Sequence, residues 1–363
     1  MTGKVLVVGA SGVVGSAALD AFLADGHEVV ALSRRLPEIE SKRPFQHLAV
    51  DLRDSAACRD SLGAFRGEIT HVAFAALYEM PGLVAGWSDD EQMQINLAML
   101  RNCLEPLIGT GSSLQHVSVM QGTKAYGFHL HPMPIPARER APRDPHPNFY
   151  WLQEDWLHDA AVSSGFHYTI LRPQMVVGGA YNAAMNVPPV LGAYAAICKE
   201  EGQPFGFPGG PSWVWEAADA RLVADVLVWA ADSPAARNQH FNVTNGDVFE
   251  WRNLWPAIAD ALGTEPGPDQ PLCLGTWLPT KADAWDRVVK KRGLREVPLP
   301  ELLGESHFCA DLVFAHGATQ PPPPAFISTI KLRQAGFTQF VDTEDTYRYW
   351  LGKLIERNII PRG

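Results

Sequence analysis

The sequence predicts an α/β fold, in which a doubly wound parallel sheet carries an interleaved, mostly helical lobe. Over the first half of the chain, short apolar runs rich in β-branched residues alternate with segments of helical periodicity, and this alternation is typical of a parallel sheet covered by helices. A glycine-rich turn at residues 9–15 directly follows the first run. Beyond about residue 174 the alternation weakens while proline, glycine and tryptophan become dense, which indicates a separate lobe.

The elements follow from their residue patterns in chain order. Residues 4–8 are predicted to form a buried strand, and the apolar spacing over residues 13–25 predicts a helix that Gly26 ends. The same reasoning predicts further strands at 28–32, 47–50, 71–76, 115–119 and 167–171, and further helices at 89–108 and 152–164. A helix at 217–232 and a strand at 239–243 follow after the lobe has begun, so we expect them to rejoin the first sheet.

The glycine-rich turn lies between the first strand and the first helix, in the order Gly9-Ala10-Ser11-Gly12-Val13-Val14-Gly15. In this context the first glycine permits a tight turn, the second lets the backbone approach a pyrophosphate, and the third lets the helix pack close to the sheet. The helix N-terminus also offers free N–H groups to phosphates. We therefore predict a Rossmann-type dinucleotide site made by Gly9, Ser11, Gly12, Val13, Val14 and Gly15.

The second strand ends in Ser33-Arg34-Arg35. Enzymes that use NAD usually carry a carboxylate here for the ribose 2′-hydroxyl, whereas a serine and two arginines suit a 2′-phosphate. We therefore expect NADPH as the cofactor. The third strand ends at Asp51, which is placed to accept a hydrogen bond from the adenine amino group, with Leu52 against the ring. Capping of the next helix is the alternative role for an aspartate at this point.

Composition excludes several classes of function. The formal net charge is −10, which disfavours nucleic acid as a partner because phosphate binding needs a basic surface. The five cysteines form neither a disulfide framework nor a Cys-x-x-Cys motif, and we expect a cytoplasmic protein that does not span a membrane. His129 and His131 have strand spacing but no third ligand nearby, so no metal site is expected.

We expect residues 1–175 to form the dinucleotide-binding domain, with residues 217–245 returning to it. Residues 176–216 and 246–363 are then expected to form the substrate-binding lobe. The sequence leaves a monomer and a homodimer both open.

The reaction centre departs from ordinary short-chain dehydrogenases, which carry Tyr-x-x-x-Lys on one helix so that the lysine lies one turn from the tyrosine. Tyr150 is the tyrosine in the right place, but Glu154 stands four residues later. A lysine occurs instead at Lys124, just after the fifth strand, and ligands bind at the carboxyl edge of such sheets. Ser118 holds the place of the usual serine on that strand, and we expect it to line the cofactor.

These residues resemble the progesterone 5β-reductase/iridoid synthase-like family, an atypical branch of the extended short-chain dehydrogenases. The similarity runs nearly end to end, and in that family the tyrosine and lysine come from separate segments. The matching stretches are residues 9–15, Ser33-Arg34-Arg35, residues 121–127, Asn148-Phe149-Tyr150-Trp151, residues 195–199 with 207–209, residues 241–249, and Ile359-Ile360-Pro361.

The resemblance implies reduction of the activated C=C bond of α,β-unsaturated carbonyl compounds with NADPH. Tyr150 is then expected to donate a hydrogen bond or proton to the carbonyl oxygen as an enolate forms, and Lys124 to lower the pKa of the tyrosine and hold ribose or tyrosine in place. Further cofactor contacts are expected from Ser118, Val119, Tyr150, Pro173, Val176 and Met185. The substrate is expected to be a small-molecule apolar enone, either a steroid or terpenoid enone or a smaller one, in a pocket walled by Tyr126, Phe149, Trp213 and Phe205.

Three other functions stay open at this point. A carbonyl reductase uses the same tyrosine to protonate an alkoxide in a 1,2-reduction, and differs from an enone reductase only in how the substrate lies over the nicotinamide. A non-catalytic sensor binds NADP(H) without turnover. A nucleotide-sugar epimerase or dehydratase is disfavoured by the missing Tyr-x-x-x-Lys.

Overall fold

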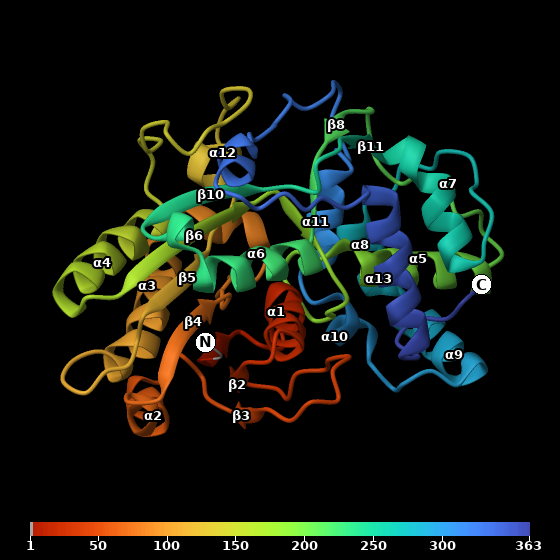
Figure 1. Ribbon diagram of the computed structural model, residues 1–363. Helices are drawn as coiled ribbons and strands as arrows, with labels where there is room; N and C mark the ends of the chain where they lie inside the picture. Colours follow the sequence, from red (N-terminus) through yellow and green to blue (C-terminus); the bar gives the residue numbers. More distant parts are fainter. Residues whose placement is uncertain (1–2) are drawn as a thin grey trace.

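The computed structural model describes residues 3–363, and these contain a seven-stranded parallel sheet (Figure 1). Its strands are β1 (Lys4–Val8), β2 (Glu28–Leu32), β3 (Gln46–Leu48), β4 (Ile69–Phe74), β5 (His116–Met120), β6 (His167–Pro173) and β10 (Gln239–Val243). They lie in the order β10-β6-β5-β4-β1-β2-β3, and each neighbouring pair is parallel. The strand order reverses between β1 and β4, and dinucleotides bind beside such a switch point in doubly wound sheets.

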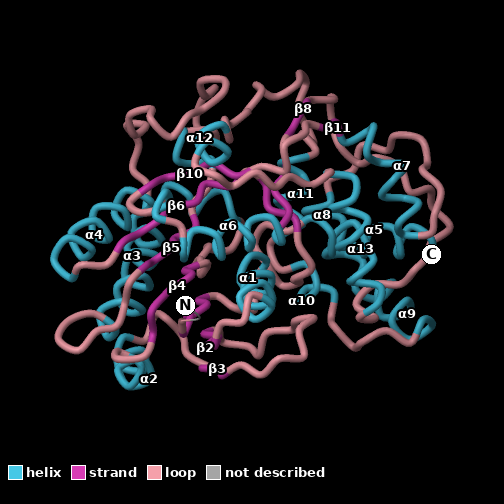
Figure 2. The backbone as a smooth tube through the Cα atoms, viewed as in Figure 1, coloured by secondary structure: helices cyan, strands magenta, loops and turns pink. Residues whose placement is uncertain are grey.

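Helices cover both faces of this sheet (Figure 2). One face carries α1 (Val13–Ala24) and α6 (Ala220–Asp232), which pack side by side, and the other carries α2 (Ser55–Leu62), α3 (Asp90–Leu104) and α4 (Phe149–Ser164). Side chains of a strand alternate between faces, so Val5 and Val7 join the core under α1 whereas Leu6 and Val8 join the core under α3. Because both faces are buried, β1 reads as a continuous apolar run.

A mostly helical lobe extends from one end of the sheet (Figure 1). Its helices are α5 (Val187–Glu200), α7 (Trp251–Leu262), α8 (Leu274–Trp277), α9 (Ala282–Arg292), α10 (Leu299–Leu303), α11 (Ser306–Val313) and α13 (Thr343–Glu356). Tyr194 and Trp285 are fully buried there and belong to the same hydrophobic cluster as Val5. The lobe and the α1 face of the sheet therefore share one core.

Short elements complete the chain. Two small sheets pair β7 (Met175–Val177) with β9 (Ala217–Asp219), and β8 (Val214–Trp215) with β11 (Phe249–Glu250). Helix α12 (Ile330–Gln334) lies against β10. Short 3-10 turns are η1 (Gly63–Phe65), η2 (Leu83–Ser88), η3 (Glu105–Leu107), η4 (Thr123–Tyr126), η5 (Pro234–Ala236) and η6 (Leu278–Lys281).

The predicted fold class is confirmed, and the strand predicted at 239–243 is β10, which pairs with β6. The differences lie at element ends. Helix α4 begins at Phe149 rather than 152, because the Asn148 side chain accepts a 3.0 Å hydrogen bond from the backbone N–H of Tyr150 and caps the helix. Residues 217–219 form β9 rather than the first turn of α6, because they pair with β7. Helix α2 has no predicted counterpart, since only two of its residues are buried.

In residues 3–363, the structure contains no helix with both the length and the apolar character that a membrane crossing requires.

Candidate active site

The glycine-rich turn adopts a conformation that suits glycine. Gly9 has a φ of +78°, a region that residues with a Cβ rarely adopt. A Cβ on Gly15 would lie 2.0 Å from the carbonyl oxygen of Gly9, so α1 rests directly on the turn. Gly12 is the N-cap of α1 and offers no side-chain cap, which leaves the first N–H groups of the helix available to an anion. A dinucleotide pyrophosphate fits this turn.

The end of β2 presents two arginines beside the turn. Ser33 is buried, and its hydroxyl donates a 2.6 Å hydrogen bond to the carbonyl of Arg35. The side chains of Arg34 and Arg35 are exposed. Arg35 lines a small cavity of 170 Å³ together with Ser11 of the turn. The Arg35 guanidinium also lies 3.9 Å from a carboxylate oxygen of Glu301.

Asp51 lies just beyond β3, and its carboxylate is already engaged. It accepts a 2.6 Å hydrogen bond from the guanidinium of Arg53 and a 3.0 Å bond from the Arg53 backbone N–H. These bonds lower the Asp51 pKa to about 2. Leu52, the residue expected against adenine, is buried in the core under α2.

Tyr150 brings its hydroxyl to the carboxyl edge of the sheet. A Cβ placed on Gly122, just after β5, would lie 3.3 Å from the Tyr150 hydroxyl oxygen and 3.6 Å from the carbonyl oxygen of Pro173 at the end of β6. The ring is buried and packs edge-on against Phe149, with centroids 4.5 Å apart. Burial raises the pKa of the hydroxyl above its usual range. The group therefore stays a phenol that can donate a hydrogen bond at neutral pH.

Lys124 comes from η4, directly after β5. Its ammonium lies 3.2 Å from Oε1 of Glu79 and 4.4 Å from the centroid of the Trp87 ring. The side chains of Lys124 and Glu79 are only 11% and 3% exposed. Burial lowers the pKa of Lys124, and the Glu79 carboxylate opposes this shift. Lys124 is thus a buried cation held by one carboxylate.

The electrostatic relation between Lys124 and Tyr150 differs from the expectation. We expect from the sequence that Lys124 lowers the pKa of Tyr150. In the structure burial raises that pKa, Glu79 raises it further, and Arg172 is the cation that lowers it. The physical reason is that burial of the phenol dominates, while the Lys124 ammonium is engaged by Glu79.

Glu154, at the position of the lysine in the ordinary motif, belongs to a buried ionic network. Its Oε1 accepts a 2.8 Å hydrogen bond from Arg172 of β6. Burial opposes ionisation, but His240, whose Nε2 lies 3.5 Å from Oε1, and the hydrogen bond and charge of Arg172 hold the pKa of Glu154 at about 2. Arg172 also donates a 3.2 Å bond to Gln121, whose amide donates to the backbone carbonyl of Tyr150 at 3.3 Å. The network therefore connects to the segment that carries the tyrosine.

An apolar cavity of 380 Å³ opens next to Trp87, the residue whose ring covers Lys124. Its walls are mostly aromatic, aliphatic and proline side chains, from Val84, Trp87, residues 128–133, Trp213, Trp215, Leu312, Val313 and residues 322–325. A cavity of this size and character suits an apolar small molecule.

The four residues predicted to wall the substrate pocket have different surroundings in the structure. Trp213 lines the cavity. Tyr126 packs in the same hydrophobic cluster as Trp213, and its hydroxyl donates a 2.7 Å bond to Asn242. Phe149 packs against Tyr150. Phe205 stacks on a tryptophan inside the helical lobe, with centroids 4.6 Å apart, so it belongs to the core of the lobe rather than to the cavity wall.

The other predicted cofactor residues differ in burial. Val119 is fully buried in the core under α3, which leaves only its backbone for a ligand. Ser118 is buried on β5. Val176 and Met185 are half-buried against the core that the sheet shares with the lobe.

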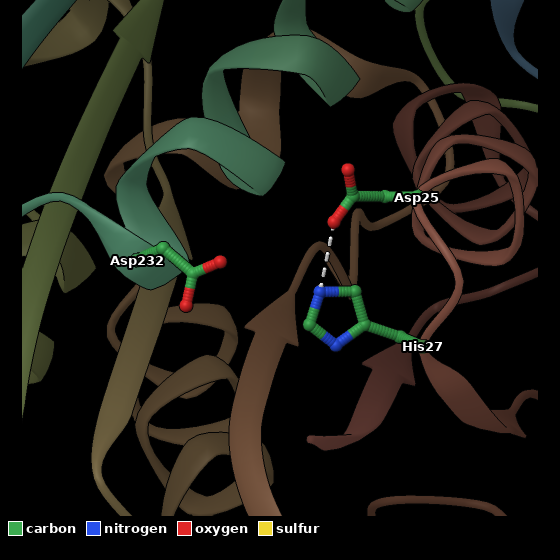
Figure 3. A group of neighbouring side chains, drawn as sticks. All are labelled: Asp25, His27 and Asp232. Atoms are coloured by element: carbon green, nitrogen blue, oxygen red, sulfur yellow. Dashed lines mark ion pairs between the residues drawn. The ribbon is translucent and has the colours of Figure 1, made fainter. Parts of the chain in front are cut away.

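One group of three side chains within residues 3–363 has the spacing to hold a metal ion, namely Asp25, His27 and Asp232. Figure 3 shows the Asp25 carboxylate directed at His27, with Asp232 across from them. The ion pair spans 3.2 Å, and the other ring nitrogen of His27 lies 3.2 Å from the carbonyl of Gly3. His27 directly precedes β2 and Asp232 is the last residue of α6. The group therefore lies at the amino edge of the sheet, opposite the glycine turn, and takes no part in the reaction centre.

Sequence reasoning missed Glu79, Trp87 and Arg172. Glu79 follows β4 at the carboxyl edge of the sheet, and the rule that pointed to Lys124 applies equally to that loop. Arg172 carries no such local signal, because only the folded chain brings it to Glu154.

Comparison with known proteins gives the family. The profile of the NAD dependent epimerase/dehydratase family matches residues 5–244. The chain is 31% identical to an (S)-8-oxocitronellyl enol synthase from Catharanthus roseus, over 98% of this chain and 92% of that protein. It is 30% identical to a 3-oxo-Delta(4,5)-steroid 5-beta-reductase from Arabidopsis thaliana, again over 98% of this chain and 92% of the relative.

Solved structures of lower identity share the fold. A UDP-glucose 4-epimerase from Thermotoga maritima, solved with UDP-glucose, superposes with a TM-score of 0.68 at 15% identity, over 97% of this chain and 99% of that one. The enzyme of the same name from Thermus thermophilus, in complex with NAD, gives a TM-score of 0.63 at 20% identity, over 96% and 97%. The family profile and the near full-length relatives show that the chain belongs to the NAD dependent epimerase/dehydratase family and, within it, to the progesterone 5β-reductase/iridoid synthase-like branch.

Proposed function

We propose that this protein reduces the activated C=C bond of α,β-unsaturated carbonyl compounds with NADPH. The observation that carries the proposal is the position of the Tyr150 hydroxyl, which lies beside Gly122 and the Pro173 carbonyl at the carboxyl edge of the sheet. The family supports it, because the steroid 5-beta-reductase of Arabidopsis thaliana is named for a 3-oxo-Delta(4,5) compound, in which a carbonyl is conjugated to a C=C bond.

The chemistry assigns one role to the tyrosine. When bound, NADPH would supply a hydride to the β-carbon of the substrate, and negative charge would then develop on the carbonyl oxygen. Tyr150 would donate a hydrogen bond to that oxygen, and a proton taken up from solvent at the α-carbon would complete the saturated carbonyl compound. Because burial raises the pKa of Tyr150, the phenol keeps its proton at neutral pH. A donor of this kind contributes about 10²–10³ in rate.

Preference for NADPH over NADH follows from the end of β2. Ser33 stands where an NAD enzyme usually has a carboxylate, and Arg34 and Arg35 are exposed beside it. Guanidinium groups bind phosphate through charge-assisted hydrogen bonds. The 2′-phosphate is therefore the group that these two arginines recognise.

The apolar cavity beside Trp87 holds the substrate. Its 380 Å³ and its aromatic and proline walls favour an apolar enone over a nucleotide sugar, which needs many polar contacts.

A product assay tests the proposal. Purified protein is incubated with 2-cyclohexen-1-one or progesterone and with NADPH or NADH, and the product is identified by mass spectrometry and NMR. We expect the saturated ketone, formed faster with NADPH. An allylic alcohol would replace the proposal with a carbonyl reductase. Tight NADPH binding without oxidation across a panel of enones would indicate a sensor.

A further inference from the structure

We propose that Glu79 is a positioning residue of the reaction centre, which anchors the Lys124 ammonium under Trp87. The expected effect of Glu79 on kcat rests on the function proposed above. The contacts of Glu79 and Trp87 with Lys124 do not depend on the identity of the substrate.

The Glu79 carboxylate is fixed through both of its oxygens. Oε1 accepts from Lys124 at 3.2 Å, and Oε2 accepts a 2.8 Å hydrogen bond from the side-chain amide of Gln92. Gln92 is itself held, because its Oε1 accepts a 2.7 Å bond from the backbone N–H of Met80 and its side chain is buried. The carboxylate therefore has one orientation, and in it one oxygen faces the lysine.

This anchor replaces a constraint that the ordinary motif obtains from its helix. In Tyr-x-x-x-Lys, one helical turn fixes the distance between the two side chains. Here Lys124 comes from η4 and Tyr150 from α4, and a lysine side chain has a flexible four-carbon stem. The loop after β4 holds the ammonium from two sides, with Glu79 at 3.2 Å and Trp87 at 4.4 Å. An ammonium buried this deeply needs such a partner, because an unpaired buried charge is costly.

The charges around Tyr150 and Lys124 give the direction in which removal of Glu79 shifts their pKa values. The charge of Glu79 raises the pKa of Tyr150, and the charge of Arg172 lowers it. Glu79 and the Cys309 thiol of α11 raise the pKa of Lys124, and Lys124 in turn lowers the pKa of His129. Removing the Glu79 charge therefore lowers the pKa of both Tyr150 and Lys124, because each loses a negative neighbour.

The variant Glu79→Gln removes the charge but keeps the size and an acceptor for Gln92. We expect kcat with NADPH and an enone to fall about 10- to 100-fold, the cost of a misplaced catalytic group, and the Kd of NADPH to stay unchanged. The basic limb of the pH profile of kcat moves to lower pH. The matched control is Glu68→Gln at the opposite end of β4, where the carboxylate is 51% exposed and pairs with Lys4. It leaves kcat and the pH profile unchanged.

A merely structural role for Glu79 predicts a different pattern. In that case Glu79→Gln lowers the melting temperature while the folded fraction keeps the wild-type kcat and pH profile, and this result would overturn the proposal. The double variant Glu79→Gln/Lys124→Met removes both buried charges. We expect it to regain thermal stability relative to Glu79→Gln and to remain as inactive as Lys124→Met alone.

A spectroscopic titration separates this inference from the proposed function. Tyrosinate absorbance is followed against pH for the wild type and for Glu79→Gln, each minus its Tyr150→Phe counterpart, so that the difference reports Tyr150. We expect Tyr150 to ionise at lower pH in Glu79→Gln. If the wild type reduces no enone, the proposed function fails, yet this titration still decides the role of Glu79. If Tyr150 ionises at the same pH in the wild type and in Glu79→Gln, the proposed role of Glu79 is wrong.

Discussion

The Glu154 carboxylate accepts a 2.8 Å hydrogen bond from Arg172 at the helix position where ordinary short-chain dehydrogenases carry a lysine. The lysine of this chain instead pairs with Glu79 at 3.2 Å. Both pairs are largely buried. One member of each pair acts on Tyr150, because the Glu79 charge raises the pKa of the phenol and the Arg172 charge lowers it.

Replacing Tyr150 by phenylalanine removes the proposed donor and little else, because the ring packs in the same place. We expect kcat/KM for an enone to fall about 10²- to 10³-fold, while the Kd of NADPH, measured by fluorescence titration, stays at the wild-type value. A variant that keeps its activity would move the donor role to another group. Tyr194→Phe is the control, because this ring is buried in the helical lobe and its hydroxyl donates a 2.9 Å hydrogen bond to the carbonyl of Gly206.

Replacing Glu154 by glutamine leaves Arg172 buried without a charged partner. Breaking a buried pair from one side costs about 3–5 kcal/mol, and we expect a loss of this order in the free energy of unfolding, measured by urea denaturation at pH 7. Glu105→Gln is the control, because its pair with Arg101 has both side chains nearly half exposed, at 47% and 49%, and such pairs contribute about 0–1 kcal/mol. Equal losses in the two variants would contradict the role of the buried network.

Replacing Arg34 and Arg35 by alanine removes the two exposed guanidinium groups beside the glycine turn. We expect the Kd of NADPH to rise about 10-fold or more, since charge-assisted hydrogen bonds are worth about 1.5–3 kcal/mol, while the Kd of NADH changes little. Isothermal titration with both cofactors measures this. A parallel loss for NADH would mean that the arginines bind the pyrophosphate or support the loop instead.

His116 makes the stability of the fold sensitive to acid. Burial lowers its pKa from 6.5 to about 3, and its ring lies 3.0 Å from the Thr169 hydroxyl. The unfolded chain takes up the proton near pH 6.5 and the native chain only near pH 3, so this contribution to stability is complete above the first pH and is lost as the pH falls toward the second.

We expect His116→Gln, which keeps a hydrogen-bonding group for Thr169, to weaken the fall in urea midpoint between about pH 7 and pH 4.5. His158→Gln serves as the control, because that side chain is 62% exposed. If the urea midpoints of both variants fall with decreasing pH as steeply as that of the wild type, groups other than His116 govern the acid sensitivity.

Much of the framework could be predicted from local patterns. The run of β1, the glycine turn and α1 depend on neighbouring residues, and the structure reproduces β1 and β2 at their predicted bounds. Tyr150 and Lys124 could be singled out because each stands in a short matching motif. The predicted start of α4 is wrong by three residues, because Asn148 acts as its cap only through a side-chain hydrogen bond.

The surroundings of the tyrosine were decided by the tertiary structure. Trp213 and Phe205 come from the same proline- and tryptophan-rich region, yet one lines the cavity and the other stacks inside the lobe. Local sequence cannot separate them, because an aromatic residue is equally suited to a core and to a pocket wall. Likewise Glu79, Lys124 and Tyr150 come from three different segments, and the charge at the phenol depends on their distances in space. Composition and periodicity therefore determine the sheet and the dinucleotide turn, whereas long-range packing determines the electrostatics of the reaction centre.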